Sequence, residues 1–398
     1  MRRTWLVVHF GLLFLLAPAN ATAQVDDVLC RNGAGSFDGE FLGNEKVHVG
    51  AAKTGGLATR TCEATLRQSD QTVVVATGAS EIDLDAFGAD VGTGGPVASF
   101  QVKKSDAECC RSYQIYSLQK LPHLLRTLTG GSSYRAADVD LDGRVEIWTD
   151  DAAAVNQFEN LSLAELDFAP PVILRFEHNQ LLDVSSEFQS YFDDRIAQQR
   201  AKLDARALKD FKDSDGKLLP DLSAPPDRMH RLRRTKIAVL EILWSYLYSG
   251  REQRAWSALA DLWPEKDAKR IQGELVSARN SGIRAQIDGD ETNTTKRKRH
   301  TEIYDVTSAA PGSAVAPPEG IMLRQSPETY AESLKSGETY LNLVIDAAGK
   351  VRSAELSGAE KSSNRALIDV AMEWTFIPAL KGGRAVASKT RLAISPKR

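Results

Sequence analysis

Aspartates at alternate positions form the clearest chemical motif of this chain. Asp138, Asp140 and Asp142 are separated by single residues, Gly143 allows a sharp turn, and a glutamate comes four residues after Asp142. Alternate residues of a tight loop point their oxygens at one centre, and Ca²⁺ takes six to eight oxygen ligands at about 2.3–2.6 Å. We therefore expect a structural Ca²⁺ site. Its expected ligands are Asp138, Asp140, Asp142, the carbonyl of Arg144, and Glu146.

The residues after this loop predict a β-strand. Val145 and Ile147 face one way, and Thr149 stands where a helix-loop-helix calcium site has its final glutamate. An Asp-x-Asp-x-Asp-Gly-x-x-Glu loop that leads into a strand resembles the cation loops of FG-GAP/VCBS repeats, which occur in integrin-type β-propeller blades. The resemblance implies the same five ligands, with Glu146 where the family usually has Asp. The alternative is an Asp-rich turn held by side-chain-to-backbone hydrogen bonds, without a metal.

The first residues have the features of a secretory signal peptide. Two arginines precede an apolar run from Trp5 to Ala17, and Ala21-Thr22-Ala23 offers a cleavage site. The run of about 13 residues is shorter than the roughly 20 that a spanning helix needs. We expect cleavage after Ala23 and a periplasmic or secreted protein with weak or no membrane contact. An uncleaved N-terminal anchor is the alternative.

Composition and charge limit the function classes. The formal net charge is -3, and it becomes -5 once Arg2 and Arg3 are removed, so there is no electrostatic basis for binding nucleic acid. With 42% hydrophobic residues over 398 positions, the chain can form the cores of two or three domains.

Four cysteines lie in the first part of the chain, and an oxidising compartment makes them disulfide candidates. One option joins Cys30 to Cys62 and Cys109 to Cys110, and the other forms two longer bridges. No Cys-x-x-Cys motif occurs, so the spacing gives no support for a redox role.

The pattern along the chain predicts a multidomain α+β protein. Residues 24–186 read as a mainly-β domain, a sandwich or a propeller-like sheet, because short strands alternate with Gly-rich turns. The single good Asp-rich loop argues against a complete propeller. Residues 187–286 predict α-helices, with expected helices over 188–211, 229–248 and 251–263. Residues 287–318 form a basic and Pro-rich linker, expected to be a flexible to semi-extended tether.

The last part, residues 319–398, predicts strand, strand, helix, strand, strand. Leu341, Leu343 and Ile345 face inward, and residues 346–350 form a hairpin turn. The motifs Asp346-x-x-Gly349-x-Val351, Ala366-Leu367-x-x-x-Ala371 and Trp374-x-Phe376-x-Pro378-Ala379 together resemble the TonB C-terminal domain family. The resemblance implies a small α+β module that binds a short extended peptide of an outer-membrane receptor, or of another envelope protein, along a sheet edge. A small domain without a partner is the alternative.

These features predict an exported, non-enzymatic envelope protein that acts as an adaptor or a transport-associated binding protein. A membrane-anchored energy transducer of the TonB type is one alternative, and an uncharacterised hydrolase is another. No Gly-x-Ser-x-Gly, His-Glu-x-x-His, phosphate-loop or dinucleotide motif occurs, and the histidines are scattered. We therefore expect no catalytic residue.

Overall fold

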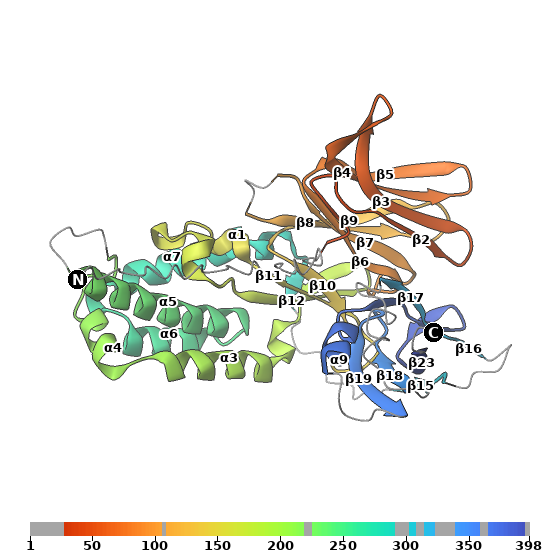
Figure 1. Ribbon diagram of the computed structural model, residues 1–398. Helices are drawn as coiled ribbons and strands as arrows, with labels where there is room; N and C mark the ends of the chain where they lie inside the picture. Colours follow the sequence, from red (N-terminus) through yellow and green to blue (C-terminus); the bar gives the residue numbers. More distant parts are fainter. Residues whose placement is uncertain are drawn as a thin grey trace, which may run out of the picture.

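The computed structural model describes residues 28–105, 109–218, 225–290, 302–307, 314–322, 339–358 and 365–394. The chain is a mixed α+β protein with a mainly-β N-terminal region, helices in the middle and a small α+β module near the C-terminus (Figure 1). The predicted signal peptide, residues 1–23, lies outside the described residues. No helix in the described part of the chain is both long and apolar enough to cross a membrane.

Three sheets make up the N-terminal region. The outer sheet consists of β2 (Phe37–Phe41), β3 (Glu45–Thr54), β4 (Leu57–Gln68) and β5 (Gln71–Ala79), in that order. The central sheet consists of β1 (Cys30–Arg31), β6 (Glu81–Ala89), β7 (Val97–Lys103), β8 (Arg111–Ser117) and β9 (His123–Gly131). The junction sheet consists of β10 (Tyr134–Ala137), β11 (Glu146–Asp150), β12 (Pro171–Glu177), β13 (Gln180–Asp183) and β14 (Gly289–Asp290).

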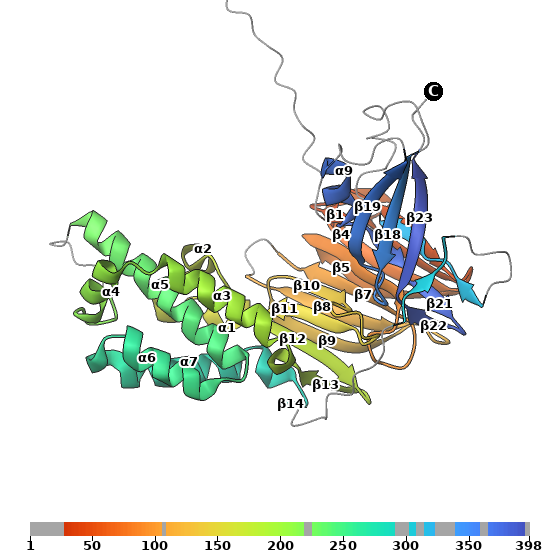
Figure 2. The same ribbon diagram turned by 90° about the horizontal axis from the view of Figure 1, so that it is seen from below.

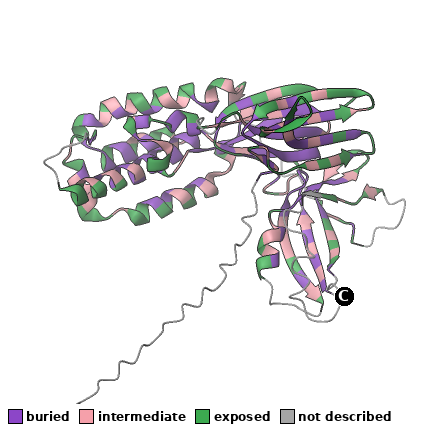
Figure 3. Ribbon diagram, turned by 45° about the horizontal axis from the view of Figure 1, so that its top comes forward, coloured by how far each residue is buried: buried purple, intermediate pink, exposed green. Residues whose placement is uncertain are grey.

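Strands β6 and β7 of the central sheet are buried on both faces. Leu84 shares one hydrophobic core with Leu66 of the outer sheet, and Val97 shares another with Ile147 of the junction sheet. Every residue of β6 is therefore buried. Figure 3 shows buried stretches, in purple, within the β layers. The sequence pattern did not reveal β6, because a strand with two buried faces lacks the apolar and polar alternation that marks a half-exposed strand.

Both disulfides follow the first of the two predicted options. Cys30 and Cys62 are bonded and fully buried between the outer and central sheets. Cys109 is bonded to Cys110 in the segment between β7 and β8.

The long helices come between β13 and β14, so the chain leaves the junction sheet, forms them and returns to it. They lie together beside the β layers (Figures 1 and 2). The long helices are α3 (Gln189–Lys202), α4 (Ala205–Lys212), α5 (Pro226–Tyr248), α6 (Glu252–Leu262) and α7 (Ala268–Ser281). The short ones are α1 (Ala152–Val155), α2 (Leu163–Leu166), and the 3₁₀ helices η1 (Phe158–Asn160), η2 (Ser185–Glu187), η3 (Glu265–Asp267) and η4 (Ile283–Gln286).

The single helix expected over residues 188–211 is two helices. The chain breaks at Asp204, whose carboxylate accepts a hydrogen bond from the Ala207 backbone N–H at 2.8 Å and so caps α4. The next helix, α5, starts at Pro226 instead of Met229, because proline suits the first position of a helix. These two differences leave the helical character of residues 187–286 as predicted.

The C-terminal module is built around β18 (Thr339–Ile345) and β19 (Val351–Gly358), which form the predicted hairpin. The remaining elements are α9 (Arg365–Ala371), β20 (Thr375–Ile377), β21 (Ala379–Lys381), β22 (Arg384–Val386) and β23 (Ser388–Ile394). Leu341, Leu343 and Ile345 are buried as predicted, in one core with Trp374. The final strand pairs with β18, which gives the order β23-β18-β19.

The predicted linker, residues 287–318, differs from a free tether where the structure describes it. Besides β14, it contains β15 (Tyr304–Asp305), which pairs with β23, and β16 (Val315–Ala316), which pairs with β21. The following β17 (Glu319–Met322) pairs with β20. Composition alone predicted a tether because these strands are short and gain their stability from partners far along the chain.

The C-terminal module packs directly against the body, by which we mean residues 28–290. Ile377 belongs to the core between the outer and central sheets, and Ala348 belongs to the core of the junction sheet. A buried ion pair joins Lys350 Nζ to Asp85 Oδ1 at 3.0 Å. The module is therefore part of the packed structure and not a separate domain at the end of a linker.

Replacement of Gly349 by alanine should destabilise the protein. Gly349 has φ +81°, and a Cβ there would lie 1.8 Å from the backbone oxygen of Phe376. We expect the free energy of unfolding to fall by roughly 3 kcal/mol or more, because both backbone strain and a backbone clash oppose the substitution. Gly382→Ala is the matched control, since Gly382 also has a positive φ, +56°, but nothing lies within 4 Å of its Cβ position. Its expected loss is about 1 kcal/mol. Thermal unfolding measures both variants, and equal losses would contradict this account.

Candidate metal centre

The Asp-rich loop is the connection between β10 and β11. These strands pair in antiparallel register down to Ala137 and Glu146, so residues 138–145 form the loop at the end of the hairpin. Leu141 and Gly143 both adopt positive φ values, 59° and 82°, and this turns the chain sharply. One carboxylate oxygen from each of Asp138, Asp140 and Asp142 comes within 4.8 Å of the other two. The structure thus gathers three of the predicted ligands at one point.

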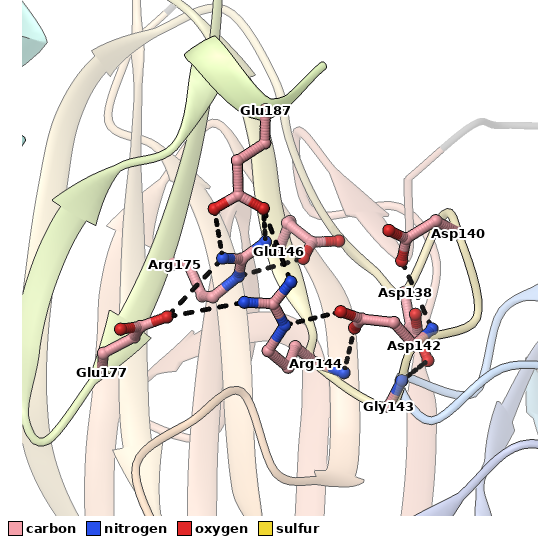
Figure 4. Close-up of polar contacts among 9 residues, drawn as sticks. All are labelled: Asp138, Asp140, Asp142, Gly143, Arg144, Glu146, Arg175, Glu177 and Glu187. Atoms are coloured by element: carbon pink, nitrogen blue, oxygen red, sulfur yellow. Dashed lines mark hydrogen bonds and ion pairs between the residues drawn. The ribbon is translucent and has the colours of Figure 1, made fainter. Parts of the chain in front are cut away.

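Hydrogen bonds to backbone N–H groups hold each aspartate of the loop. Asp138 Oδ2 accepts from Gly143 at 3.0 Å, and Asp140 Oδ1 accepts from Asp142 at 3.3 Å. Asp142 Oδ1 accepts from the Arg144 backbone at 2.8 Å, and its Oδ2 accepts from the Arg144 guanidinium at 2.6 Å (Figure 4). These are the bonds that a metal-free Asp-rich turn would make, so they are compatible with both predictions for this loop.

Two buried carboxylate oxygens of the site lack hydrogen-bond partners among the described residues. They are Asp138 Oδ1 and Glu146 Oε2. Both side chains are fully buried, at 0% exposure. Leaving a buried carboxylate oxygen without a partner is costly, so such atoms mark positions where an ion or a water belongs. An oxygen-ligated cation would satisfy both atoms, and its presence stays a prediction.

Glu146 has a second contact that the sequence did not reveal. Its Oε1 accepts from Arg175 Nη2 at 2.8 Å, and the arginine reaches on to Glu187 at 2.8 Å. Figure 4 shows Glu146 between Arg175 and the loop, with one oxygen at the arginine and the other facing the aspartates. Glu146 is not in the group of three that lies within 4.8 Å, so its ligation stays a prediction. Ligation by the backbone carbonyl of Arg144 likewise stays a prediction. The side chain of Arg144 binds Asp142.

Burial and neighbouring carboxylates raise the pKa values of two acidic groups at this site. Burial, and after it the Asp346 carboxylate, raise the pKa of Asp138 to about 7. Burial also raises the pKa of Glu146 to about 8, even though Arg175 acts to lower it. Asp140 and Asp138 add to the rise at Glu146, which places all three in one electrostatic group. A divalent cation would stabilise the charged carboxylates, and the all-oxygen set suits Ca²⁺.

The loop also contacts the C-terminal module, which the sequence analysis did not foresee. The backbone N–H of Asp138 donates to Asp346 Oδ2 at 3.1 Å, and Arg352 Nη2 donates to the backbone oxygen of Val139 at 3.2 Å. Asp346 Oδ1 in turn accepts from the backbone of Lys350 at 2.8 Å, which fixes the hairpin turn. Burial raises the pKa of Asp346 to about 6. The candidate metal centre therefore lies at the junction of body and module.

A cavity of about 220 Å³ lies at the same junction. Its lining includes Asp85, Arg135, Lys350 and Glu373. The carboxylate of Asp85 is already engaged, since it pairs with Lys350 and accepts from the Tyr113 hydroxyl at 2.6 Å. The polar groups of this cavity thus link the central sheet to the module, and no histidine is among its lining residues.

Calcium should stabilise the protein, and Asp138 should be required for this. When the Ca²⁺ concentration is 100 times the dissociation constant, the bound ion adds about 2.7 kcal/mol to the free energy of unfolding. This corresponds to a rise in melting temperature of a few degrees. Asp138→Asn should abolish the rise without lowering the melting temperature of the ion-free protein, because ionised Asp138 is unfavourably buried. Asp261→Asn, at an exposed position of α6, is the control and should keep the full response.

Thermal unfolding with and without CaCl₂, together with isothermal titration calorimetry, measures these effects. Neither heat of binding nor a change in melting temperature for the unmodified protein would support the metal-free turn.

The chain matches no family model, no curated protein and no solved structure. The resemblance of residues 134–150 to FG-GAP/VCBS cation loops stays a prediction, as does the resemblance of residues 319–398 to TonB C-terminal domains. The geometry adds to them a loop that gathers three aspartates, and a small α+β module whose hairpin turn contacts that loop.

Proposed function

We propose that this chain is an exported, non-enzymatic envelope protein whose C-terminal module binds a short extended peptide along the edge of β23. A Ca²⁺ ion in the Asp-rich loop stabilises the junction on which the module rests. The peptide belongs to an outer-membrane receptor or another envelope protein. The main support is that β23 already accepts an added strand from its own chain.

The added strand is β15, which runs parallel to β23. Tyr304 pairs with Ser388 and Asp305 pairs with Lys389. The backbone N–H of Tyr304 donates to the oxygen of Ala387 at 3.0 Å, and that of Val306 donates to the oxygen of Lys389 at 2.9 Å. An extended segment can therefore satisfy this edge through main-chain hydrogen bonds, the bonding used when a peptide adds a strand to a sheet.

Side chains give the edge a means of selection. Val306 is buried, at 7% exposure, in the short described segment 302–307. The Tyr304 ring lies under Lys381, with Nζ 4.3 Å from the ring centroid, and its hydroxyl is 2.7 Å from the same nitrogen. A peptide with an apolar residue two places after an aromatic one would reproduce both contacts.

Much of the edge extends beyond β15. The added strand pairs with the first two residues of β23, and β23 continues to Ile394 with no other strand on that side in the described ranges. N–H and C=O groups of one residue point to the same side of a strand, and those of the next residue to the other side. The backbone oxygen of Lys389 accepts from Val306 on the side away from β18. The backbone N–H and C=O groups of Arg391 and Ala393 therefore also face the open edge.

A labelled peptide with the sequence Glu-Ile-Tyr-Asp-Val-Thr, the sequence of residues 302–307, tests the proposal. In the full chain the peptide competes with the internal segment of the same sequence, which already occupies this edge through β15, so peptide binding should be weak. Val306→Asp places a charge at a buried position and should release the internal strand, which should raise peptide affinity roughly tenfold or more. Thr307→Asp, at an exposed neighbouring position, is the control and should leave affinity unchanged.

Arg391→Pro, made together with Val306→Asp, tests the edge itself, because the outward N–H of Arg391 lies opposite the carbonyl of the peptide's valine. Proline removes one outward N–H and leaves the hydrogen bonds to β18 in place, so the fold should survive while peptide binding falls about tenfold. Fluorescence anisotropy measures the affinities, and thermal unfolding checks the fold. If Val306→Asp folds but binds no peptide at millimolar concentration, the proposed function is wrong.

A further inference from the structure

Cys109 and Cys110 form a disulfide between neighbouring residues at the surface. The Sγ atoms are bonded, and the pair lies just before β8, in the segment that follows β7. Cys109 is exposed and Cys110 is half-buried. Cys109 is thus the more accessible residue of the pair to an attacking thiol.

The two disulfides of this chain differ in what they can do for stability. The Cys30–Cys62 bond closes a loop with a sequence separation of 32, and both of its residues are fully buried. A disulfide stabilises a fold mainly by restricting the unfolded chain, and the effect grows with the length of the closed loop. The Cys109–Cys110 bond has a sequence separation of 1, so it restricts the unfolded chain hardly at all. A gain in folding stability therefore does not explain why this bond is present.

The surroundings of the pair suit thiol chemistry. An open cavity of about 280 Å³ lies beside it and is lined by both cysteines, by Lys104 and Arg111, and by Thr129 of β9. Lys104 is exposed, and the Arg111 guanidinium is held by Glu81 at 2.7 Å. Nearby cations stabilise a thiolate and so make a cysteine sulfur a better leaving group.

We propose that Cys109–Cys110 is a thiol–disulfide exchange site that reacts with an external thiol, independently of the peptide-binding edge. The thiolate attacks Cys109 Sγ, the Cys109–Cys110 bond breaks, and its electron pair leaves on Cys110 Sγ as a thiolate. A second thiolate attacks the external sulfur of the mixed disulfide and releases Cys109. The protein gains two thiols, and the external thiols become a disulfide. The reverse reaction oxidises an external dithiol.

Differential alkylation of the folded full chain tests this site. Without reductant, N-ethylmaleimide should label no cysteine. With limiting dithiothreitol, mass spectrometry should find label at Cys109 and Cys110 roughly 100-fold faster than at Cys30 and Cys62, which are buried. Label before any reductant is added, or equal rates at all four cysteines, would overturn the proposal.

Single substitutions test the direction of attack. In Cys110→Ser the exposed Cys109 thiol should react with Ellman's reagent at least about tenfold faster than the half-buried Cys110 thiol does in Cys109→Ser. Both variants should melt within about 2 °C of the unmodified protein, because the bond restricts so little chain. Reversed rates, or a large loss of stability, would contradict the assignment.

Two further reductants distinguish the sources of the thiol. Reduction of the pair by glutathione identifies a low-molecular-weight thiol, and reduction only by a dithiol protein identifies a protein partner. Reduction by neither, in protein whose Cys30–Cys62 bond stays intact, would overturn the proposal.

Discussion

Buried carboxylates meet where the C-terminal module rests on the body, and the arrangement depends on how their charge is offset. Asp85 is offset by a lysine of the module, and Glu146 by an arginine of the junction sheet. Asp346 is held by backbone N–H groups. Asp138 Oδ2 accepts from the Gly143 backbone N–H, but its Oδ1, like Glu146 Oε2, is buried without a hydrogen-bond partner in the described part of the chain. An ionised carboxylate in this position is unfavourable without a cation, so the loop is the point at which an ion would act on the whole structure.

The location of this loop changes how the C-terminal module is understood. The sequence favours a module that moves on a linker, whereas the structure packs it against the central sheet through Lys350 and Ile377. The edge of β23 is then presented on a fixed support and partly occupied by residues 304–305. Binding in our proposal therefore requires exchange of an internal strand for an external one. The cost of releasing the internal strand lowers the apparent affinity, which favours peptides that match its side-chain contacts.

Local patterns in the sequence were sufficient for some elements and not for others. The hairpin of β18 and β19 follows from strict alternation and a turn with glycine at Gly349, and the Asp-rich loop follows from residue spacing. The strand β6 was missed because both of its faces are buried. The partner of Glu146 is Arg175, 29 residues away, and the partner of Asp138 is Asp346, 208 residues away. Such contacts arise from the packing of sheets and leave no short-range pattern.

Hydrogen exchange with and without CaCl₂ tests the central claim most directly, which is that an ion in the Asp-rich loop fixes the C-terminal module to the body. The reporters are the backbone amides of Ala348 and Lys350, which donate to Asp346, and the amide of Asp138, which donates to the same side chain. The account predicts that Ca²⁺ slows exchange in both segments together, while exchange in α5 is unchanged. Slower exchange confined to residues 138–146, or no change in either segment, would contradict it.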